Sequence, residues 1–324
     1  MPGILRRLVV LALVTIVALE LSLRFYIFGL DALSYKKMNS HLLLMDSGLV
    51  QPAANTDIYY ELRPNLDALF RGKRLVSNSR GLPDKEYTLE KPDGVYRIAV
   101  AGSSWTMATS VELDETYHSV LEESLNEIYA PQKFEVINFA LEHYGLSEIV
   151  ASIRYKALEY DPDMIIVSIT SATPAILWED QKAPFSPTDT VKPFWQSYLY
   201  STVAQLAGRK GYARSKRPNV DLEQGGYPRQ IRRALEKIGE LTEGRNIEVI
   251  VIFQTASEYQ ESQINAAGKA ASKEGFRLIY MNLENLAAEA NSTDKMTTGR
   301  IDLHPSPAAH KLVAEKLLSE VWGH

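Results

Sequence analysis

Two short segments near opposite ends of this chain carry residues that could act together in acyl transfer. The first is Gly102-Ser103-Ser104, which directly follows a short apolar run, and the second is Asp302-Leu303-His304. A serine hydroxyl becomes a nucleophile when a histidine accepts its proton, and a carboxylate can hold that histidine in the required tautomer. The two segments together therefore predict a serine nucleophile with a histidine base, provided that the fold brings them to one place.

Each segment also has a simpler interpretation. A serine and a glycine after a strand commonly form a turn or cap a helix. Asp302 or Ser306 could cap the terminal helix, and His310, inside that helix, is expected to be a packed histidine.

The elements that must position these residues alternate between short apolar runs and helical patterns. Aliphatic and β-branched runs predict strands that are buried on both faces, and the alternation predicts a parallel sheet with right-handed crossovers. The expected strands are 96–101, 134–139, 164–169, 248–253 and 277–283, and the expected helices are 116–129, 147–158, 229–241, 262–274 and 308–321. The predicted fold is a three-layer α/β/α sandwich around a five-stranded parallel sheet, with a ligand site at the carboxyl ends of the strands.

The N-terminal residues predict a membrane anchor. Arg6 and Arg7 precede an uncharged apolar run from 8 to 19, and apolar character returns after Glu20 and Arg24. Glu20 and Arg24 lie four residues apart, so on a helix they can pair. A cleaved signal peptide is the alternative, but no good small-x-small cleavage site follows the run, which favours a retained anchor.

The predicted domain organisation has three parts. These are an anchor at 1–34, a membrane-proximal linker with irregular strands at 35–92, and an α/β domain at 93–324 with an aromatic-rich insertion at 174–226. The insertion is too long for an ordinary connection. It could form a small helical core of its own, cap the site, or provide a surface that touches glycan or membrane.

Composition excludes several classes of function. A net charge of −5 over 324 residues gives no basic face for nucleic acid. The absence of cysteine excludes disulfides, thiolate metal sites and a cysteine nucleophile. Histidine spacing predicts no metal site, and no phosphate loop or dinucleotide fingerprint is present, so no cofactor is expected.

Taken together, residues 95–322 resemble the SGNH, or GDSL-like, hydrolase family. Gly102-Ser103-Ser104-Trp105-Thr106 is similar to the family's Gly-Asp-Ser block, and Asp302-Leu303-His304-Pro305-Ser306 is similar to its closing Asp-His-Pro block. The resemblance implies Ser104 as nucleophile, His304 as base and Asp302 as its orienting carboxylate. The layout also resembles members associated with exopolysaccharide loci, which carry features like Glu20, Arg24 and Asn78-Ser79-Arg80-Gly81.

The middle of the family pattern is altered in this chain. Ala140 stands where the family's oxyanion-hole glycine is expected, and no asparagine occurs in 167–173, where the family's third block would supply one. The resemblance then leaves the amides or hydroxyls of Ser104, Ala140, Thr170 and Ser171 as oxyanion donors, with Thr173 as a further hydroxyl. Loss of one donor costs about 10²–10³ in rate. Expected pocket residues are Ser103, Trp105, His143 and Trp178.

The sequence thus predicts an extracytoplasmic serine esterase or O-acyltransferase, anchored to the cytoplasmic membrane by a single span, with its domain on the periplasmic side. The expected substrate is an acyl ester, often acetyl, of an envelope or secreted polysaccharide. The alternative is an accessory protein that keeps the fold but binds glycan or partner proteins. A lipid esterase is a weaker third possibility, since no interfacial helix is evident from the sequence.

Overall fold

A computed structural model describes residues 2–170, 173, 192–206, 226–256, 261–299 and 302–323. The chain divides into two compact units. The first comprises Met1–Gly48, Leu69–Gly72 and Pro187–Arg217, and the second Leu49–Ala68, Lys73–Ser186 and Pro218–His324. The boundaries expected after residues 34 and 92 stay predictions. Of the insertion predicted at 174–226, residues 174–191 and 207–225 lie outside the described part of the chain.

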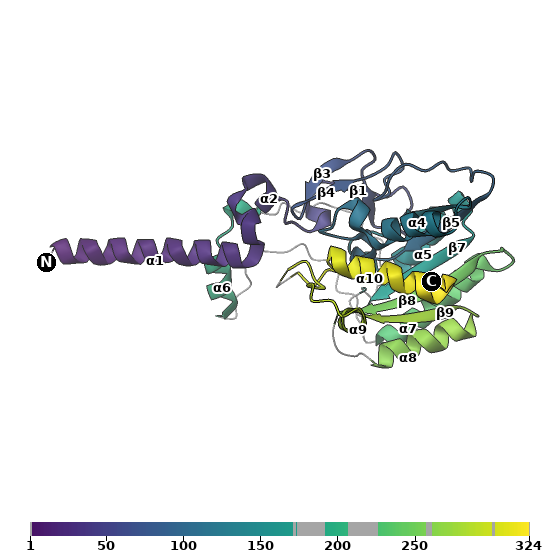
Figure 1. Cartoon of the computed structure of the whole chain (residues 1–324). Helices are drawn as coiled ribbons and strands as arrows, with labels where there is room; N and C mark the ends of the chain where they lie inside the picture. The colour runs from purple at the N-terminus through teal and green to yellow at the C-terminus, as the bar shows by residue number, and fades with distance from the viewer. Residues whose placement is uncertain are drawn as a thin grey trace. The chain divides into compact units, whose positions relative to one another are not determined.

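The first unit is built around one long helix, α1 (Pro2–Phe28), drawn in purple in Figure 1. The segment from Gly3 to Leu33 contains an 18-residue window with a mean hydropathy of 2.3 and is long enough to cross a membrane, the one such helix among the described residues. Three short elements and one further helix belong to the same unit. They are a 3₁₀ helix at Gly29–Leu33, α2 at Tyr35–Asn39, a 3₁₀ helix at Pro193–Trp195 and α6 at Tyr198–Leu206.

The second unit contains a five-stranded sheet with the strand order β6-β5-β7-β8-β9. Every neighbouring pair in it is parallel. The strands are β5 (Val95–Ala101), β6 (Lys133–Asn138), β7 (Met164–Thr170), β8 (Glu248–Thr255) and β9 (Arg277–Asn282). The first of these strands along the chain, β5, lies between the second and the third, so chain direction across the sheet reverses there. In sheets of this topology the ligand crevice lies at that switch point, outside the carboxyl ends of the strands.

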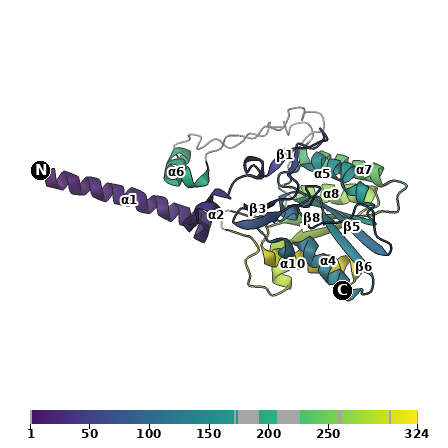
Figure 2. The same cartoon turned by 90° about the horizontal axis from the view of Figure 1, so that it is seen from above.

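Helices cover both faces of the sheet. Figure 2 shows α4 and α10 on one side and α5, α7 and α8 on the other. Their bounds are α4 (Tyr117–Ile128), α5 (Leu146–Tyr155), α7 (Gly226–Thr242), α8 (Glu261–Lys273), α9 (Leu283–Glu289) and α10 (Pro307–Leu317), with a one-turn α3 at Ser104–Met107. The three-layer sandwich predicted from the sequence is therefore confirmed.

Alternation along the strands explains how two cores form. Ile98 and Val100 of β5 pack into the cluster with Leu121 and Leu125 of α4 and Val313 of α10. The intervening strand residues point to the opposite face, because successive side chains of a strand alternate. Leu121 and Leu125 lie four residues apart on one helical face, and burial of each such side chain contributes about 1.5–3 kcal/mol.

The remaining elements are two hairpins and several short helical turns. Two hairpins form separate two-stranded sheets, β1 (Val50–Pro52) with β2 (Tyr60–Leu62), and β3 (Asp67–Phe70) with β4 (Lys73–Val76). Further 3₁₀ turns are Leu44–Asp46, Leu113–Glu115 and Ala157–Tyr160, and a π-helical turn, Leu318–Trp322, extends α10. The irregular strands expected in this region are thus present.

The Asn78-Ser79-Arg80-Gly81 stretch forms a turn. The Asn78 Oδ1 atom accepts hydrogen bonds from the backbone N–H groups of Arg80 and Leu82, both at 3.0 Å. Gly81 has a φ of +72°, and a side-chain Cβ there would lie 2.5 Å from the carbonyl oxygen of Leu62. Glycine is therefore required at this position, and the turn leads directly to Asp84, which contacts the strand next to β5.

Candidate active site

Ser104 lies at the carboxyl end of β5, at the switch point of the sheet. Gly102 leaves the strand so close to its neighbours that a Cβ there would lie 2.4 Å from Thr106 Oγ1 and 3.0 Å from Ser168 Cβ. Ser103 then takes the N-cap position of α3, and Ser104 is the first residue of that helix. Ser104 is half-buried as a residue, whereas the neighbouring Ser103 and Trp105 are buried.

Asp302 and His304 form a pair on the loop before α10. The His304 Nδ1 atom is hydrogen-bonded to Asp302 Oδ1, and the His304 backbone N–H donates to the same oxygen at 3.2 Å. The loop is held by bonds from Thr298 N to the His304 carbonyl (2.9 Å) and from Ser306 N to the Met296 carbonyl (2.9 Å). With Nδ1 engaged by the carboxylate, Nε2 is the ring atom that can accept a proton.

The segment after Ser104 reaches Asp302. The Ser110 hydroxyl lies 3.4 Å from Asp302 Oδ2, and the Thr109 backbone N–H donates to the Ser104 carbonyl at 3.2 Å. Ser110 has a left-handed backbone, with a φ of +71°. The two segments that the sequence predicts to meet are thus joined through Ser110, a residue that the sequence analysis did not identify.

A second contact joins the same two parts of the chain through His310. Its Nδ1 atom accepts a hydrogen bond from the Tyr117 N–H at 3.2 Å, and the two rings stack with centroids 5.8 Å apart. Tyr117 in turn donates from its hydroxyl to Thr106 Oγ1 at 3.2 Å. Burial lowers the pKa of His310 to about 3, and electrostatic interactions with the neighbouring imidazole rings of His118 and His304 act in the same direction. His310 is therefore a neutral, packed histidine, as expected from the sequence.

Ser104 and His304, expected from the sequence to be nucleophile and base, are linked indirectly, through the contact of Ser110 with Asp302 and the bond of Asp302 to His304. Across the residues that the structure describes, no hydrogen bond joins the Ser104 hydroxyl to His304, whose side chain is 18% exposed. Catalytic hydrogen bonds are often long before substrate binds. The geometry thus forms the carboxylate–histidine half of a triad and leaves the serine–histidine half open.

Asn138, at the end of β6, organises the floor of the site. This fully buried side chain donates to the Thr106 carbonyl at 2.9 Å and accepts from the Ala140 N–H at 2.9 Å. Its backbone N–H donates to Asp84 Oδ2 at 2.8 Å. Asn138 therefore anchors α3 beside β6, and the Ala140 amide, expected as an oxyanion donor, is already engaged.

Thr170 is engaged in a similar way at the end of β7. Its backbone N–H donates to Thr173 Oγ1 at 2.8 Å, and the two threonine hydroxyls lie 3.1 Å apart. Tyr227 donates from its hydroxyl to the Thr170 carbonyl at 2.8 Å. Ser171, the other expected donor in this segment, lies outside the described residues.

Burial limits what the expected pocket residues can contact. Ser103 is buried, and Trp105 belongs to the hydrophobic cluster with Ala309 of α10. Both side chains therefore pack inside the protein. Trp178 lies outside the described residues. His143 has a left-handed backbone (φ +64°) and a half-exposed side chain, and its Nδ1 atom lies 3.7 Å from the carboxylate of buried Glu142.

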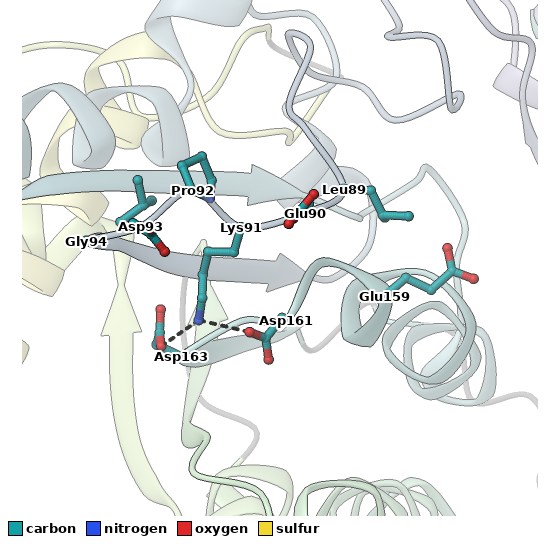
Figure 3. Close-up of a pocket in the computed structure, with 10 residues that line it drawn as sticks. Leu89, Glu90, Lys91, Pro92, Asp93, Gly94, Glu159, Asp161 and Asp163 are labelled. Atoms are coloured by element: carbon teal, nitrogen blue, oxygen red, sulfur yellow. Dashed lines mark hydrogen bonds and ion pairs between the residues drawn. The ribbon is translucent and has the colours of Figure 1, made fainter.

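Two cavities among the described residues are lined by residues other than Ser104. One, of about 710 Å³, is lined by residues 89–95 and by Glu159, Asp161 and Asp163, near the amino ends of β5 and β7. Figure 3 shows Lys91 in that cavity, reaching Asp163 at 2.9 Å and Asp161 at 3.3 Å. The other, of about 340 Å³, is lined by Glu61, Ser79, Arg80, Leu82, Tyr155, Lys156 and Tyr160. Among the described residues no group of three His, Cys, Asp or Glu side chains is placed to hold a metal ion.

No family model matches the chain, and no curated protein matches it in sequence. Solved structures do match in three dimensions. A lipase/acylhydrolase from Enterococcus faecalis is 14% identical, covers 70% of this chain and 96% of its own, and has a TM-score of 0.44. The acetyl xylan esterase AlAXEase is 14% identical over 69% of this chain and 99% of its own, with a TM-score of 0.42. TesA is 13% identical over 68% and 95%, with a TM-score of 0.43.

Proposed function

We propose that this protein is a membrane-anchored serine esterase or O-acyltransferase in which Ser104 is the nucleophile, His304 the general base and Asp302 the residue that orients the base. The observation that carries this proposal is the hydrogen bond between Asp302 and His304 Nδ1. It leaves His304 Nε2 as the proton acceptor, and the contact of Asp302 with Ser110 brings the pair to the segment that begins with Ser104.

The reaction follows from these roles. The Ser104 Oγ atom attacks the carbonyl carbon of an ester while its proton passes to His304 Nε2. The tetrahedral intermediate collapses, the alkoxide leaving group takes that proton from His304, and an acyl ester remains on Ser104. A water molecule or a second hydroxyl then attacks the acyl carbon while His304 accepts its proton, and the bond from the acyl carbon to Ser104 Oγ breaks as His304 returns the proton to Ser104. Water gives hydrolysis and a sugar hydroxyl gives transfer.

The developing oxyanion requires a donor, and the Ser104 backbone N–H is the best placed. As the first residue of α3, Ser104 has an N–H with no acceptor inside that helix. The Ala140 and Thr170 amides would have to exchange their present partners, Asn138 and Thr173, to contribute. A single donor supports a slower reaction than a complete hole, by about 10²–10³ for each donor missing.

The expected substrate is an acyl ester, often acetyl, on an envelope or secreted polysaccharide, met on the extracytoplasmic side of the cytoplasmic membrane. Two features of the chain support this. The α1 segment can anchor the protein to a membrane, and Arg6 and Arg7 before the apolar run favour a cytoplasmic N-terminus.

The direct test measures acetate release from p-nitrophenyl acetate and from an acetylated polysaccharide by the full chain in detergent. Ser104→Ala should lower the rate at least about a hundredfold, because the nucleophile is lost. Ser103→Ala is the matched control, since this neighbouring serine is buried at the N-cap of α3 and should retain most of the activity. Equal rates for the protein and Ser104→Ala would refute the proposal.

One observation favours a second candidate, a binding protein of polysaccharide assembly without catalysis. The Ala140 and Thr170 amides are engaged within the protein, and the Ser104 hydroxyl is not bonded to His304. Such a protein would bind the acetylated polysaccharide equally well with and without Ser104→Ala, and neither form would release acetate.

A further inference from the structure

Two charged residues interrupt the apolar surface of α1, and each is paired. The Arg24 Nε atom lies 2.8 Å from Glu20 Oε1, and both side chains are 18% exposed. An unpaired charge within a membrane span is costly, and such residues are found facing protein rather than lipid. The partners of Glu20 and Arg24 therefore indicate what lies beside α1 at their depth.

Apart from Met38, whose Sδ atom lies 3.9 Å from Arg24 Nη1, the hydrogen-bonding partners of the pair among the described residues belong to residues 194–199. Arg24 Nη2 donates to the carbonyl oxygens of Phe194 (3.1 Å) and Gln196 (3.0 Å). The Arg24 guanidinium also lies over the Phe194 ring, 5.5 Å from its centroid. These contacts bring an irregular backbone segment against α1 with its carbonyl groups satisfied.

Glu20 binds hydrogen-bond donors at the start of α6, whereas Arg24 binds acceptors just before it. Its carboxylate accepts hydrogen bonds from the backbone N–H groups of Tyr198 (3.2 Å) and Leu199 (2.9 Å) and from the Ser197 hydroxyl (3.1 Å). A carboxylate there satisfies N–H groups that a helix leaves without partners and lies at the positive end of the helix dipole. The start of α6 is therefore fixed at the level of Glu20 along α1.

The outward face of α6 is apolar. Tyr200, Val203 and Leu206 are 61%, 56% and 84% exposed, and Trp195 just before the helix is 68% exposed. In a water-soluble helix this face would be polar. In the second unit, Leu303 is the only large apolar side chain among the described residues that is more than half exposed.

The hydroxyl groups of α6 are satisfied within the helix. Ser201 donates to the Ser197 carbonyl at 3.0 Å, and Thr202 donates to the Tyr198 carbonyl at 2.8 Å. Groups at membrane depth need internal partners, because lipid tails offer none. These two hydroxyl groups of α6 thus meet the requirement that lipid contact imposes.

Depth along α1 agrees with lipid contact. A hydrocarbon core of about 30 Å takes roughly 20 helical residues, so a span that begins after Arg7 extends to about Ile27. Glu20 then lies about 18 Å from the start of the span, in the half of the bilayer nearer the end of α1.

We infer that residues 192–206 form a second membrane contact, in which Trp195, Tyr200, Val203 and Leu206 touch the acyl chains of the leaflet at the C-terminal end of α1. Glu20 and Arg24 are the residues that hold this segment against α1. The protein would then contact the lipid through two elements, α1 and residues 192–206, and not through α1 alone.

The test uses the full chain, which contains no cysteine, in phosphatidylcholine vesicles. A single cysteine introduced as Val203→Cys is labelled with an environment-sensitive fluorophore, and lipids with a nitroxide on the acyl chain serve as quencher. Lipid contact at this depth should shift the emission to the blue and lower its intensity roughly twofold or more. Ser262→Cys, on the exposed start of α8, is the control and should keep a water-like, unquenched signal.

Two results would overturn the inference. A water-like, unquenched signal at position 203 would mean that α6 faces solvent. A blue-shifted signal that nitroxide lipids do not quench would mean that protein, such as a second copy of the chain, covers α6 in place of lipid. Quenching that is lost in the double variant Glu20→Leu, Arg24→Leu would attribute the placement of α6 to this pair. Quenching that persists there would remove these two residues from the proposal.

Discussion

The five parallel strands begin at one edge of the sheet, the amino edge, and end at the other, the carboxyl edge. Both edges carry charged side chains, but the hydrogen bonding of these side chains differs. At the amino edge, fully buried Arg97 binds Glu135 and the carbonyl oxygens of Leu89 and Tyr160. At the carboxyl edge, His304 is bound within the described residues through one ring nitrogen, which leaves the other for a proton in the proposed reaction. A cavity of about 710 Å³ also lies at the amino edge. We expect the reactive edge to be the one where a polar atom keeps bonding capacity, and not the one beside this cavity.

The largest expected effect on the rate of ester hydrolysis comes from removing the proposed base, His304. His304→Ala should lower ester hydrolysis by about 10³, because the serine would have no proton acceptor. His41→Ala is the control, since this histidine pairs with Asp31 in the first unit and should leave the rate unchanged. Steady-state kinetics with p-nitrophenyl acetate measure both, and equal rates for the protein and His304→Ala would remove the distinction between the edges.

The amino edge should respond in stability rather than in rate. Arg97→Met leaves Glu135 without its buried partner and should lower the free energy of unfolding by about 3–5 kcal/mol. Arg277→Met removes a more exposed pair with Glu320 and should cost less than about 1 kcal/mol. Urea denaturation in detergent compares the two. A folded Arg97→Met protein that has lost turnover would instead assign chemistry to the amino edge.

The proposed role of the carboxyl edge can be tested further by changing the residue that orients His304. Asp302→Asn should lower the rate by at least about 10²-fold, because an amide does not stabilise the imidazolium and permits the other tautomer. Asp294→Asn, an exposed aspartate near Ser292, is the matched control. A rate for Asp302→Asn within twofold of the parent would show that Asp302 does not orient the base.

The last prediction concerns acid stability, where a modest effect per pH unit accumulates as the pH falls. Burial lowers the pKa of His310 to about 3, so below its ordinary value near 6.5 the unfolded chain binds a proton that the folded chain does not. Stability should therefore fall as the pH decreases from about 6.5 to 3, by at most about 1.4 kcal/mol per pH unit for this group. His310→Gln lacks this proton, so its stability deficit at pH 7 should shrink toward pH 4. A deficit that stays constant with pH would contradict the assignment.

Most of the fold follows from local patterns in the sequence. All five predicted strands are present, within one residue at their amino ends and two at their carboxyl ends, because continuous β-branched runs are typical of strands buried on both faces. The α9 helix was missed, since it begins at Leu283 with no loop after β9. Asn282, whose side chain accepts a hydrogen bond from the Asn285 N–H at 2.9 Å, was the available signal.

The site was less accessible to prediction. Ser104, Asp302 and His304 follow from residue type and resemblance, but their support depends on contacts that span the sequence. Ser110 reaches Asp302 from 192 positions away, and no local pattern encodes that distance. The occupation of the Ala140 amide by Asn138 depends on the path of the chain after β6, which residue types alone do not give.

The most direct test of the central claim is covalent labelling of Ser104. The full chain in detergent is treated with a fluorophosphonate, which reacts with serines activated by a histidine base, and the modified peptide is identified by mass spectrometry. The account predicts one adduct on Ser104 that is lost in His304→Ala and retained in Ser103→Ala. No adduct on Ser104, or an adduct that forms equally in His304→Ala, would contradict it.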